Sequence, residues 1–488
     1  MIKTKNAIKI NNSDNVVVAV DNIKTGEKIF SIEAKCDIPI GHKMALESIA
    51  VGKNIIKYGS PIGSATTEIK PGEFVHTHNI KTNLSAIEEY TYNPVRKQQL
   101  VAPIEHSFWG FNRPDGQVGI RNDVWVISTV GCVNKIAEKI AEQAGIYNVY
   151  TFAHPYGCSQ LGADHLYTQK ILANMVKHPN AGGVLVLGLG CENNHIEAFK
   201  EVLGEYDPNR VKFLNTQDVQ DEIAEGVKII KELSDYSAQF KRKPIPLGRL
   251  IIGLKCGGSD GLSGITANPL VGSLSDVIIS HGGTSILTEV PEMFGAETLL
   301  MNRATDTVVF DKTVQLINNF KDYFIRHGQE IYENPSPGNK EGGISTLEEK
   351  SLGCTQKGGY CAVADVLNYG ERVKKTGLIL LQGPGNDIVA VTNLTAAGAH
   401  IILFTTGRGT PLGSPVPVVK ISSNNTLAET KPHWVDFNAG PLATGEVTMQ
   451  ELTTQLVEYI INVASYEQTH NEKNNYREIS IWRDGVTL

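Results

Sequence analysis

The chain has 488 residues, of which 41% are hydrophobic and 20% charged, a composition typical of a globular protein with several domains and not of disordered or fibrous classes. Its formal charge of −7, and the lack of basic runs interleaved with aromatic residues, argue against a nucleic-acid or membrane-surface binder. The N-terminus lacks the apolar core of a secretion signal, and every apolar run is too short to span a bilayer. We therefore expect a cytoplasmic protein with no membrane or nucleic-acid partner.

The first 85 residues are typical of a small all-β domain. Short β-prone runs at residues 15–20, 27–30 and 54–58 are separated by turns rich in Gly and Asn. The polar stretch that follows, residues 86–107, has little periodicity and is the predicted linker.

The predicted β domain carries a His-x-His motif, His76-Thr77-His78. In an extended strand this spacing would place both imidazoles on one face. His42 follows another predicted strand of the same domain. Imidazole is a good ligand for divalent transition metals, so His42, His76 and His78 are the predicted metal ligands. The alternative is an exposed or hydrogen-bonded histidine pair.

From residue 108 onward, apolar strands alternate with amphipathic helices, which predicts mainly parallel sheets with right-handed crossovers. A basic stretch with two prolines, residues 241–246, divides this part. The predicted fold class is α/β: the small β domain over 1–85, then one or two Rossmann-like domains, with bounds 108–245 and 246–488.

Glycine turns follow several of these predicted strands. At a helix N-terminus, their backbone amides suit a carboxylate. None matches a dinucleotide or P-loop fingerprint, so no NAD and no nucleotide is expected. Arg408 lies in a later Gly-Arg-Gly turn, where it could bind a carboxylate or form a structural salt bridge. With plain tight turns as the alternative, the candidate substrate-binding residues are Ser159, Gln160, Asn193, Asn194, Ser259, Asp260 and Arg408.

The seven cysteines contain no CxxC pair, which argues against a zinc ribbon or a thioredoxin-like site. Cys132, Cys158 and Cys191 each follow a glycine near a predicted strand end, where sites in open α/β sheets collect. They are candidates for additional metal ligands. The alternative is that these thiols only fill small spaces beside the turns.

Four residues are candidates for the catalytic acid or base: Lys43, His78, His281 and Glu289. Glu289 belongs to Thr288-Glu289-Val290-Pro291-Glu292, a carboxylate pair that could ligate a hard metal or exchange protons. A helix N-terminus enriched in Glu would explain the same pair.

Seven motifs follow one another along the chain: Gly41-His42-Lys43, His76-Thr77-His78-Asn79, Tyr156-Gly157-Cys158-Ser159-Gln160, Gly190-Cys191-Glu192-Asn193-Asn194, Cys256-Gly257-Gly258-Ser259-Asp260, Thr288-Glu289-Val290-Pro291-Glu292 and Gly353-Cys354-Thr355-Gln356-Lys357. Taken together, these motifs resemble the altronate/galactarate dehydratase family, which also includes sulfolactate sulfo-lyase. The resemblance covers essentially the whole chain and implies that the β domain is a SAF (β-clip) module.

The resemblance implies a hydro-lyase that converts D-altronate to 2-dehydro-3-deoxy-D-gluconate in galacturonate breakdown. It also implies a divalent metal, Fe²⁺ before Mn²⁺. Such a metal could offset the charge that forms when a proton next to a carboxylate is removed. We expect a small sugar acid as the binding partner and a homodimer as the assembly.

Other functions remain as alternatives. The residues in the motifs resemble those of altronate enzymes more than those of galactarate enzymes. Galactarate dehydratase, or another sugar-acid lyase of the family, is therefore the second candidate function. The single fused chain argues against the sulfo-lyase. An iron–sulfur dehydratase is less favoured, because the cysteines are scattered along the sequence. A non-catalytic sugar-acid-binding protein is also less favoured, because the polar motif residues are intact.

Overall fold

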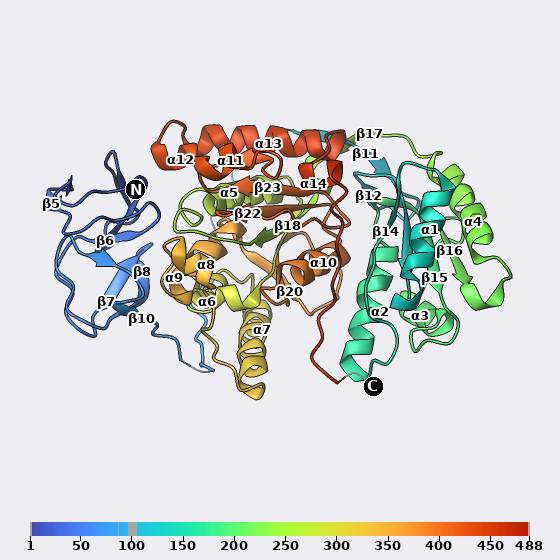
Figure 1. The fold of residues 1–488 in the computed structure, drawn as a ribbon, viewed down its shortest axis with the longest axis horizontal. Helices are drawn as coiled ribbons and strands as arrows, with labels where there is room; N and C mark the ends of the chain where they lie inside the picture. Colours follow the sequence, from blue (N-terminus) through green and yellow to red (C-terminus); the bar gives the residue numbers. More distant parts are fainter. Residues whose placement is uncertain (1, 86, 96–104, 487–488) are drawn as a thin grey trace.

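The computed structural model describes residues 2–85, 87–95 and 105–486. Figure 1 shows three bodies along the long axis: the β-rich N-terminal domain at one end, the C-terminal α/β domain in the middle, and the first α/β domain at the other end. Within the described residues, no helix has both the length and the apolar character needed to cross a membrane.

The N-terminal domain is built from antiparallel strands, as predicted. One sheet has the order β1-β2-β3-β6-β9 and another β10-β8-β7, and β4 pairs with β5. Buried aliphatic side chains from the two larger sheets form its cores. The strands are β1 (Ile2–Lys3), β2 (Ala7–Lys9), β3 (Val16–Ala19), β4 (Lys28–Ile29), β5 (Ile32–Glu33), β6 (Lys43–Ala45), β7 (Asn54–Lys57), β8 (Ser60–Ala65), β9 (Phe74–Val75) and β10 (Ile80–Lys81).

The first α/β domain contains a four-stranded parallel sheet in the order β14-β13-β15-β16. All residues of β13 are buried because helices cover both faces: Val124 and Val126 pack with α1 and α4, while Trp125 and Ile127 belong to the core that includes α2 and α3. The elements are β13 (Asp123–Ser128), α1 (Asn134–Ala144), β14 (Val149–Thr151), α2 (Gly162–Val176), β15 (Ala181–Gly188), α3 (Ile196–Leu203), β16 (Val211–Asn215) and α4 (Glu222–Ser237).

The C-terminal domain contains a seven-stranded parallel sheet in the order β20-β21-β19-β18-β22-β23-β24. Its strands are β18 (Ile251–Cys256), β19 (Thr284–Leu287), β20 (Val363–Leu367), β21 (Gly377–Leu381), β22 (Ile401–Thr406), β23 (Val418–Ser422) and β24 (Phe437–Asn438). Strands β19 to β21, which follow β18 in the chain, lie on one side of it, and strands β22 to β24, which come later, lie on the other side. Ligands of open α/β sheets bind at the carboxyl ends of strands beside such a reversal.

Helices cover this sheet and extend from it. They are α5 (Ala267–Ser280), α6 (Glu297–Met301), α7 (Thr307–Arg326), α8 (Pro337–Glu341), α9 (Leu347–Cys354), α10 (Asp387–Ala397), α11 (Asn425–Thr430), α12 (Pro441–Thr444), α13 (Met449–Ser465) and α14 (His470–Lys473). The short helix η4 (Val290–Met293) follows β19. In Figure 1, α8 and α9 lie on the side of the sheet that faces the N-terminal domain, and α10 lies on the side of the first α/β domain.

Two further segments join the α/β domains. Strand β11 (Ser107–Asn112) pairs antiparallel with β12 (Val118–Gly119) and with β17 (Lys243–Pro246). The C-terminal tail runs back along α2, where the backbone N–H groups of Asp484 and Gly485 donate to the carboxylate of Asp164 at 2.8 Å each. The predicted linker, residues 86–107, falls partly outside the described residues.

Candidate active site and metal centre

Buried charged and thiol side chains gather at the carboxyl edge of the seven-stranded sheet. Strand β18 ends there, β19 leads into η4, and α9 packs against η4. Each side chain of this edge cluster is less than a tenth exposed: Lys255, Cys256, Glu289, Glu292, Lys350, Cys354 and Lys357.

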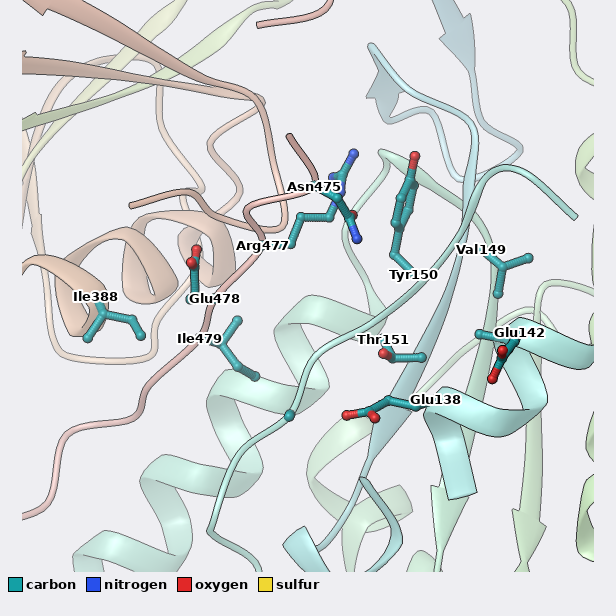
Figure 2. Close-up of a pocket in the computed structure, with 12 residues that line it drawn as sticks. Glu138, Glu142, Val149, Tyr150, Thr151, Ile388, Asn475, Arg477, Glu478 and Ile479 are labelled. Atoms are coloured by element: carbon teal, nitrogen blue, oxygen red, sulfur yellow. The ribbon is translucent and has the colours of Figure 1, made fainter. Parts of the chain in front are cut away.

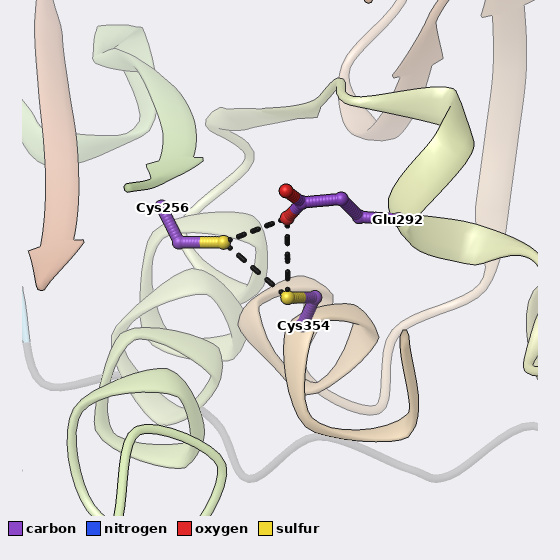
Figure 3. A group of neighbouring side chains, drawn as sticks. All are labelled: Cys256, Glu292 and Cys354. Carbon is purple, nitrogen blue, oxygen red and sulfur yellow. Dashed lines mark hydrogen bonds between the residues drawn. The ribbon is translucent and has the colours of Figure 1, made fainter. Parts of the chain in front are cut away.

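At the centre of the edge cluster, two thiols face one carboxylate (Figure 3). The Sγ atoms of Cys256 and Cys354 lie 3.0 and 3.2 Å from Oε2 of Glu292 and 3.3 Å from each other. In the described part of the chain, this is the one group of at least three His, Cys, Asp or Glu residues whose ligand atoms all lie within 4.8 Å of one another. Thiolate and carboxylate donors at this spacing fit a divalent transition metal.

Lysines keep the Glu292 carboxylate ionised. Lys350 lies 2.8 Å from its Oε1 atom. Burial opposes ionisation, but the charges of Lys350, Lys255 and Lys357 outweigh burial and lower the pKa of Glu292 below its usual range. The side chain is therefore ready to act as a metal ligand at neutral pH.

The Glu289 carboxylate contacts two lysines and one backbone N–H group. It ion-pairs with Lys255, lies 3.5 Å from Lys357, and accepts the Cys256 N–H at 2.9 Å through Oε2. Its backbone adopts φ 70°, a left-handed conformation that a non-glycine residue rarely adopts. Both carboxylate oxygens are thus used in holding β18 and its neighbours.

A cavity of about 740 Å³ opens beside the thiols, within the usual range for a small-molecule site. One wall is the N-terminus of α10, where the Asn386 side chain caps the Val389 N–H at 3.2 Å. Asp387 also lines the cavity and ion-pairs with Lys255 at 2.8 Å. The other polar or glycine lining residues are Cys256, Gly257, Gly258, Glu292, Glu333, Asn334, Ser336, Asn339, Lys350 and Gly385.

The N-terminal domain supports the edge cluster through α9. Glu349, one residue before Lys350, lies 2.8 Å from Lys43 and 2.7 Å from Lys57, with all three side chains buried. Burial lowers the pKa of Lys43 to about 8. Although burial opposes ionisation of Glu349, Lys43 and Lys57 lower its pKa to about 2. Close backbone contact at Gly41 (φ +81°) adds to this interface, because a Cβ there would lie 2.9 Å from Gly342 O.

The structure contradicts one prediction about the histidines. Strand β9 ends at Val75, so His76 and His78 lie in a turn and do not alternate along a strand. The Asn79 side chain closes that turn by accepting the His76 N–H at 3.0 Å and donating to Phe74 O at 2.9 Å.

The histidines adjoin the loop that leads to the cavity. The rings of His42 and His76 are 5.0 Å apart, and Nδ1 of His76 lies 3.0 Å from Ser345 Oγ. Burial, together with Lys43 and His42, lowers the pKa of His76 to about 4. Burial likewise lowers the pKa of His42. Both imidazoles are therefore neutral, although the three predicted histidines do not bring their ligand atoms within 4.8 Å of one another.

The four predicted catalytic residues lie in different surroundings, and His78 lies in the turn after β9 described above. Glu289 belongs to the edge cluster, as described above. Lys43 is fully buried and donates to Gly343 O at 2.8 Å, Ser345 Oγ at 2.9 Å and Glu349, which uses all three of its protons. His281 follows α5 at the amino end of β19, with Nδ1 2.7 Å from Val277 O, so it lies at the other end of the strand from Glu289.

The predicted substrate residues of the C-terminal domain, Ser259, Asp260 and Arg408, do not line the cavity beside the thiols, and Ser259 and Asp260 line a separate, smaller one. Asp260 accepts hydrogen bonds from Ser263, Ser423 and Asn424, which indicates that it organises its loop. The buried Ser259 Oγ has no hydrogen-bond partner among the described residues. Arg408 forms a half-exposed ion pair with Glu341 of α8 at 3.0 Å.

The predicted residues of the first α/β domain lie at the carboxyl edge of its own sheet. Ser159 donates its N–H to Asn193 Oδ1 at 2.8 Å, and Asn194 donates to Thr129 O at 3.0 Å. Gln160 accepts the Gly157 N–H at 2.9 Å. Cys132 and Cys158 line a separate cavity there, and these two thiols and Cys191 are exposed.

Sequence reasoning missed several residues of the edge cluster as functional residues. Cys256 and Cys354 stood in recognised motifs but outside the predicted ligand set, and the lysines carried no pattern of their own. Glu292 was considered only as part of a carboxylate pair with Glu289. The available signal for Lys255 and Cys256 is their position at the end of a strand. The missed residues of the edge cluster are Lys255, Cys256, Lys350, Cys354 and Lys357, and Glu349, beside the cluster, was missed as well.

All three parts of the chain match domains of the same protein family. Residues 5–83 match the altronate/galactarate dehydratase SAF domain. Residues 110–238 match the second domain of D-galactarate dehydratase/altronate hydrolase. Residues 247–487 match the D-galactarate/altronate dehydratase C-terminal domain.

Curated relatives are similar over nearly the whole chain. An altronate dehydratase of Bacillus subtilis is 54% identical, with 99% of this chain and 100% of that protein covered. An altronate dehydratase of Escherichia coli is 50% identical, with 99% of each covered. A galactarate dehydratase (L-threo-forming) of Escherichia coli is 33% identical, with 94% of this chain and 92% of that protein covered.

Proposed function

This chain belongs to the D-galactarate/altronate dehydratase family of hydro-lyases, and from that premise we propose that it converts D-altronate to 2-dehydro-3-deoxy-D-gluconate as a step of galacturonate breakdown. The higher identity to altronate dehydratases than to galactarate dehydratase supports the choice of substrate. The observation that carries the proposal is the cavity at the carboxyl edge of β18, with two thiols and an ionised carboxylate in or beside its wall.

The reaction would depend on a divalent metal held by Cys256, Glu292 and Cys354. Their donor atoms already converge, and Glu292 is ionised. The metal would offset the negative charge that builds up when the C–H bond next to the substrate carboxylate breaks. Thiolate donors favour iron over manganese, which is better suited to oxygen ligands. His42, His76 and His78 remain the second proposed ligand set.

The cavity supplies groups for a polyhydroxylated acid. The N-terminus of α10 is placed to bind the substrate carboxylate. Lys350 adds positive charge to the same wall, although its three protons already bind Glu292, Asn334 and Asn339. Ser336, Asn334 and Asn339 line the same cavity and can hydrogen-bond hydroxyl groups. This combination suits a sugar acid.

Proton removal needs a general base beside the substrate, and a carboxylate can fill that role. Asp387 is such a group: it lines the cavity, begins α10 and is held by Lys255. We assign the proton transfer to Asp387. Glu289, which does not line the cavity, then acts as a positioning residue that holds Lys255 and Lys357.

A panel of sugar acids tests this proposal. The purified protein, supplied with Fe²⁺ or Mn²⁺, should release a 2-keto acid from D-altronate, lose that activity on chelation, and regain it when metal is returned. Formation of a 2-keto acid from galactarate and not from altronate would move the chain to the galactarate branch. Turnover of altronate that survives thorough chelation would overturn the metal dependence.

A further inference from the structure

A second group of cysteines lies at the carboxyl edge of the first α/β domain. Cys132 follows β13, Cys158 follows β14 and Cys191 follows β15, and these three strands are neighbours in the sheet. All three cysteines are exposed. Cysteine is among the most often buried residue types, so three exposed thiols on adjacent loops are unusual.

The loops that carry these thiols are packed backbone against backbone. The Gly131 N–H donates to Tyr156 O at 2.9 Å, and the Asn194 N–H donates to Gly157 O at 3.0 Å. Only glycine fits at Gly157, because its φ is +100° and a Cβ there would lie 2.0 Å from Thr129 O. The Gly-Cys pairs are therefore fixed parts of one layer and not three independent turns.

At this carboxyl edge, which we call the cysteine edge, two of the three thiols line a cavity of about 580 Å³: Cys132 and Cys158, together with Asn134. Cys191 lies on the neighbouring loop, after β15. The loops also carry buried polar atoms with no hydrogen-bond partner among the described residues. Asn134 Oδ1 belongs to a residue that lines the cavity, whereas Gln160 and Asn194, with the unpaired atoms Nε2 and Oδ1, belong to the same loops but do not line it. An unpaired buried donor is costly, and the Gln160 Nε2 donor is the one that an acceptor such as a cluster sulfide can satisfy.

The residues that line this cavity all belong to the first α/β domain, and the cavity adjoins the interface with the C-terminal domain. The cavity in Figure 2, of about 600 Å³, lies between β14 and α1 on one side and α10 and the C-terminal tail on the other. It shares Ala153 with the cavity of the cysteine edge and Ile388 with the cavity beside Cys256. The three cavities thus follow one another along the interface.

The donor set at the cysteine edge consists of thiols. Glu192 accepts the N–H groups of Leu189 at 3.0 Å and Gly190 at 2.7 Å, so its carboxylate is used by its own loop. His154 is buried, with Nε2 2.8 Å from Ser128 O and Nδ1 accepting the Tyr156 N–H. Neither residue is available as a fourth ligand.

The spacing of the thiols argues against a single ion. Two thiolates on one zinc lie at most about 4.6 Å apart, since each Zn–S bond is about 2.3 Å. The three thiols here form no group of ligand atoms within 4.8 Å of one another. An iron–sulfur cluster places several iron and sulfide atoms between its thiolates and so fits a wider set.

We infer that Cys132, Cys158 and Cys191 bind an iron–sulfur cluster that leaves one iron without a cysteine ligand, facing the cavity at the domain interface. Their scattered sequence positions argue against a cluster only until the fold places the three loops side by side. This site is separate from the proposed metal site at Cys256, Glu292 and Cys354, and it does not depend on the proposed reaction.

The test uses the full-length protein, purified and reconstituted without oxygen from ferrous iron and sulfide. We expect acid-labile sulfide bound in stoichiometric amount and visible absorption from thiolate–iron charge transfer. The triple variant Cys132→Ser/Cys158→Ser/Cys191→Ser should lose the bound sulfide and the absorption. The Cys36→Ser variant is the matched control and should retain both.

Two outcomes would overturn the inference. One is a wild-type protein that binds no sulfide after reconstitution, including one that binds zinc alone. The other is a triple variant that keeps its sulfide while Cys256→Ser or Cys354→Ser loses it. Activity with altronate is scored separately, so failure of the proposed reaction and failure of the cluster are distinguishable.

Discussion

Similar loops that contain glycine and cysteine lie at the carboxyl edges of the two α/β sheets, but the thiols that these loops carry lie in opposite surroundings. Cys256, after β18, is 1% exposed and lies among ionised lysines and carboxylates, whereas Cys158, after β14, is exposed. The difference comes from what covers each edge. Helix α9, held by the N-terminal domain, closes over Cys256. In the described residues, no comparable helix packs over Cys158. A local motif therefore does not set the chemistry of a thiol; the element packed on it does.

The largest effect is expected when the ion pairs between α9 and the N-terminal domain are removed. Glu349→Ala would leave Lys43 and Lys57 buried without their partner, at a cost of about 3–5 kcal/mol in the free energy of unfolding. Urea denaturation measures it. Glu341→Ala is the control, because its pair with Arg408 is exposed and should be worth at most about 1 kcal/mol. A Glu349→Ala variant as stable as this control would mean that the N-terminal domain does not hold α9.

The second-largest effect should be weaker metal binding when a proposed ligand in the edge cluster is replaced. Cys354→Ser and Glu292→Gln are expected to lower the affinity for Fe²⁺ or Mn²⁺ by at least about 10–100-fold, the range seen for residues that only support ligands. Competition with a chelating dye measures the affinity. Cys361→Ser, a buried thiol outside the edge cluster, should keep it. Equal affinities in all three variants would remove the edge cluster as the metal site.

The histidines give a smaller, pH-dependent effect. The pKa of His76 is lowered from 6.5 to about 4 in the folded protein. The unfolded chain then binds more protons between these values, so stability should fall as the pH drops from 6.5 to about 4. His76→Gln should flatten the dependence of the urea midpoint on pH in this window. An unchanged slope in His76→Gln would show that the histidine is not held neutral by the fold.

The smallest effect is expected at the other edge. In metal-free protein, Cys132→Ser and Cys158→Ser should change the free energy of unfolding by no more than about 0.5 kcal/mol, as exposed substitutions usually do. Cys256→Ser, in the buried cluster, should cost more. Equal losses measured by urea denaturation would mean that both edges are packed alike, and the comparison would fail.

The sequence predicted the sheets and the loops better than it predicted what covers them. The apolar run of β13 and the Gly-Cys turns followed from local patterns that need no partner. Helix α9 did not: its residues Glu348, Glu349 and Lys350 look exposed, yet all eight residues of the helix are buried. Their partners, Lys43, Lys57 and Glu292, lie far away in the chain, and periodicity carries no information about such pairs.

The prediction that His76 and His78 share one face of a strand was wrong for a local reason. A spacing of two predicts one face of a strand only where the strand continues, and here Asn79 turns the chain directly after Val75. Asn side chains commonly form such turns with nearby backbone groups. The position of Asn79, just after the motif, was the available signal.

The central claim is that the metal and the sugar acid meet at the carboxyl edge of β18. The most direct measurement is a crystal structure of the protein with Mn²⁺ and D-altronate, collected so that manganese gives an anomalous signal. The account predicts an anomalous peak between Cys256, Glu292 and Cys354, with the sugar acid in the adjoining cavity near Lys350. A peak held by His42, His76 and His78, with no manganese at Cys256, would contradict it.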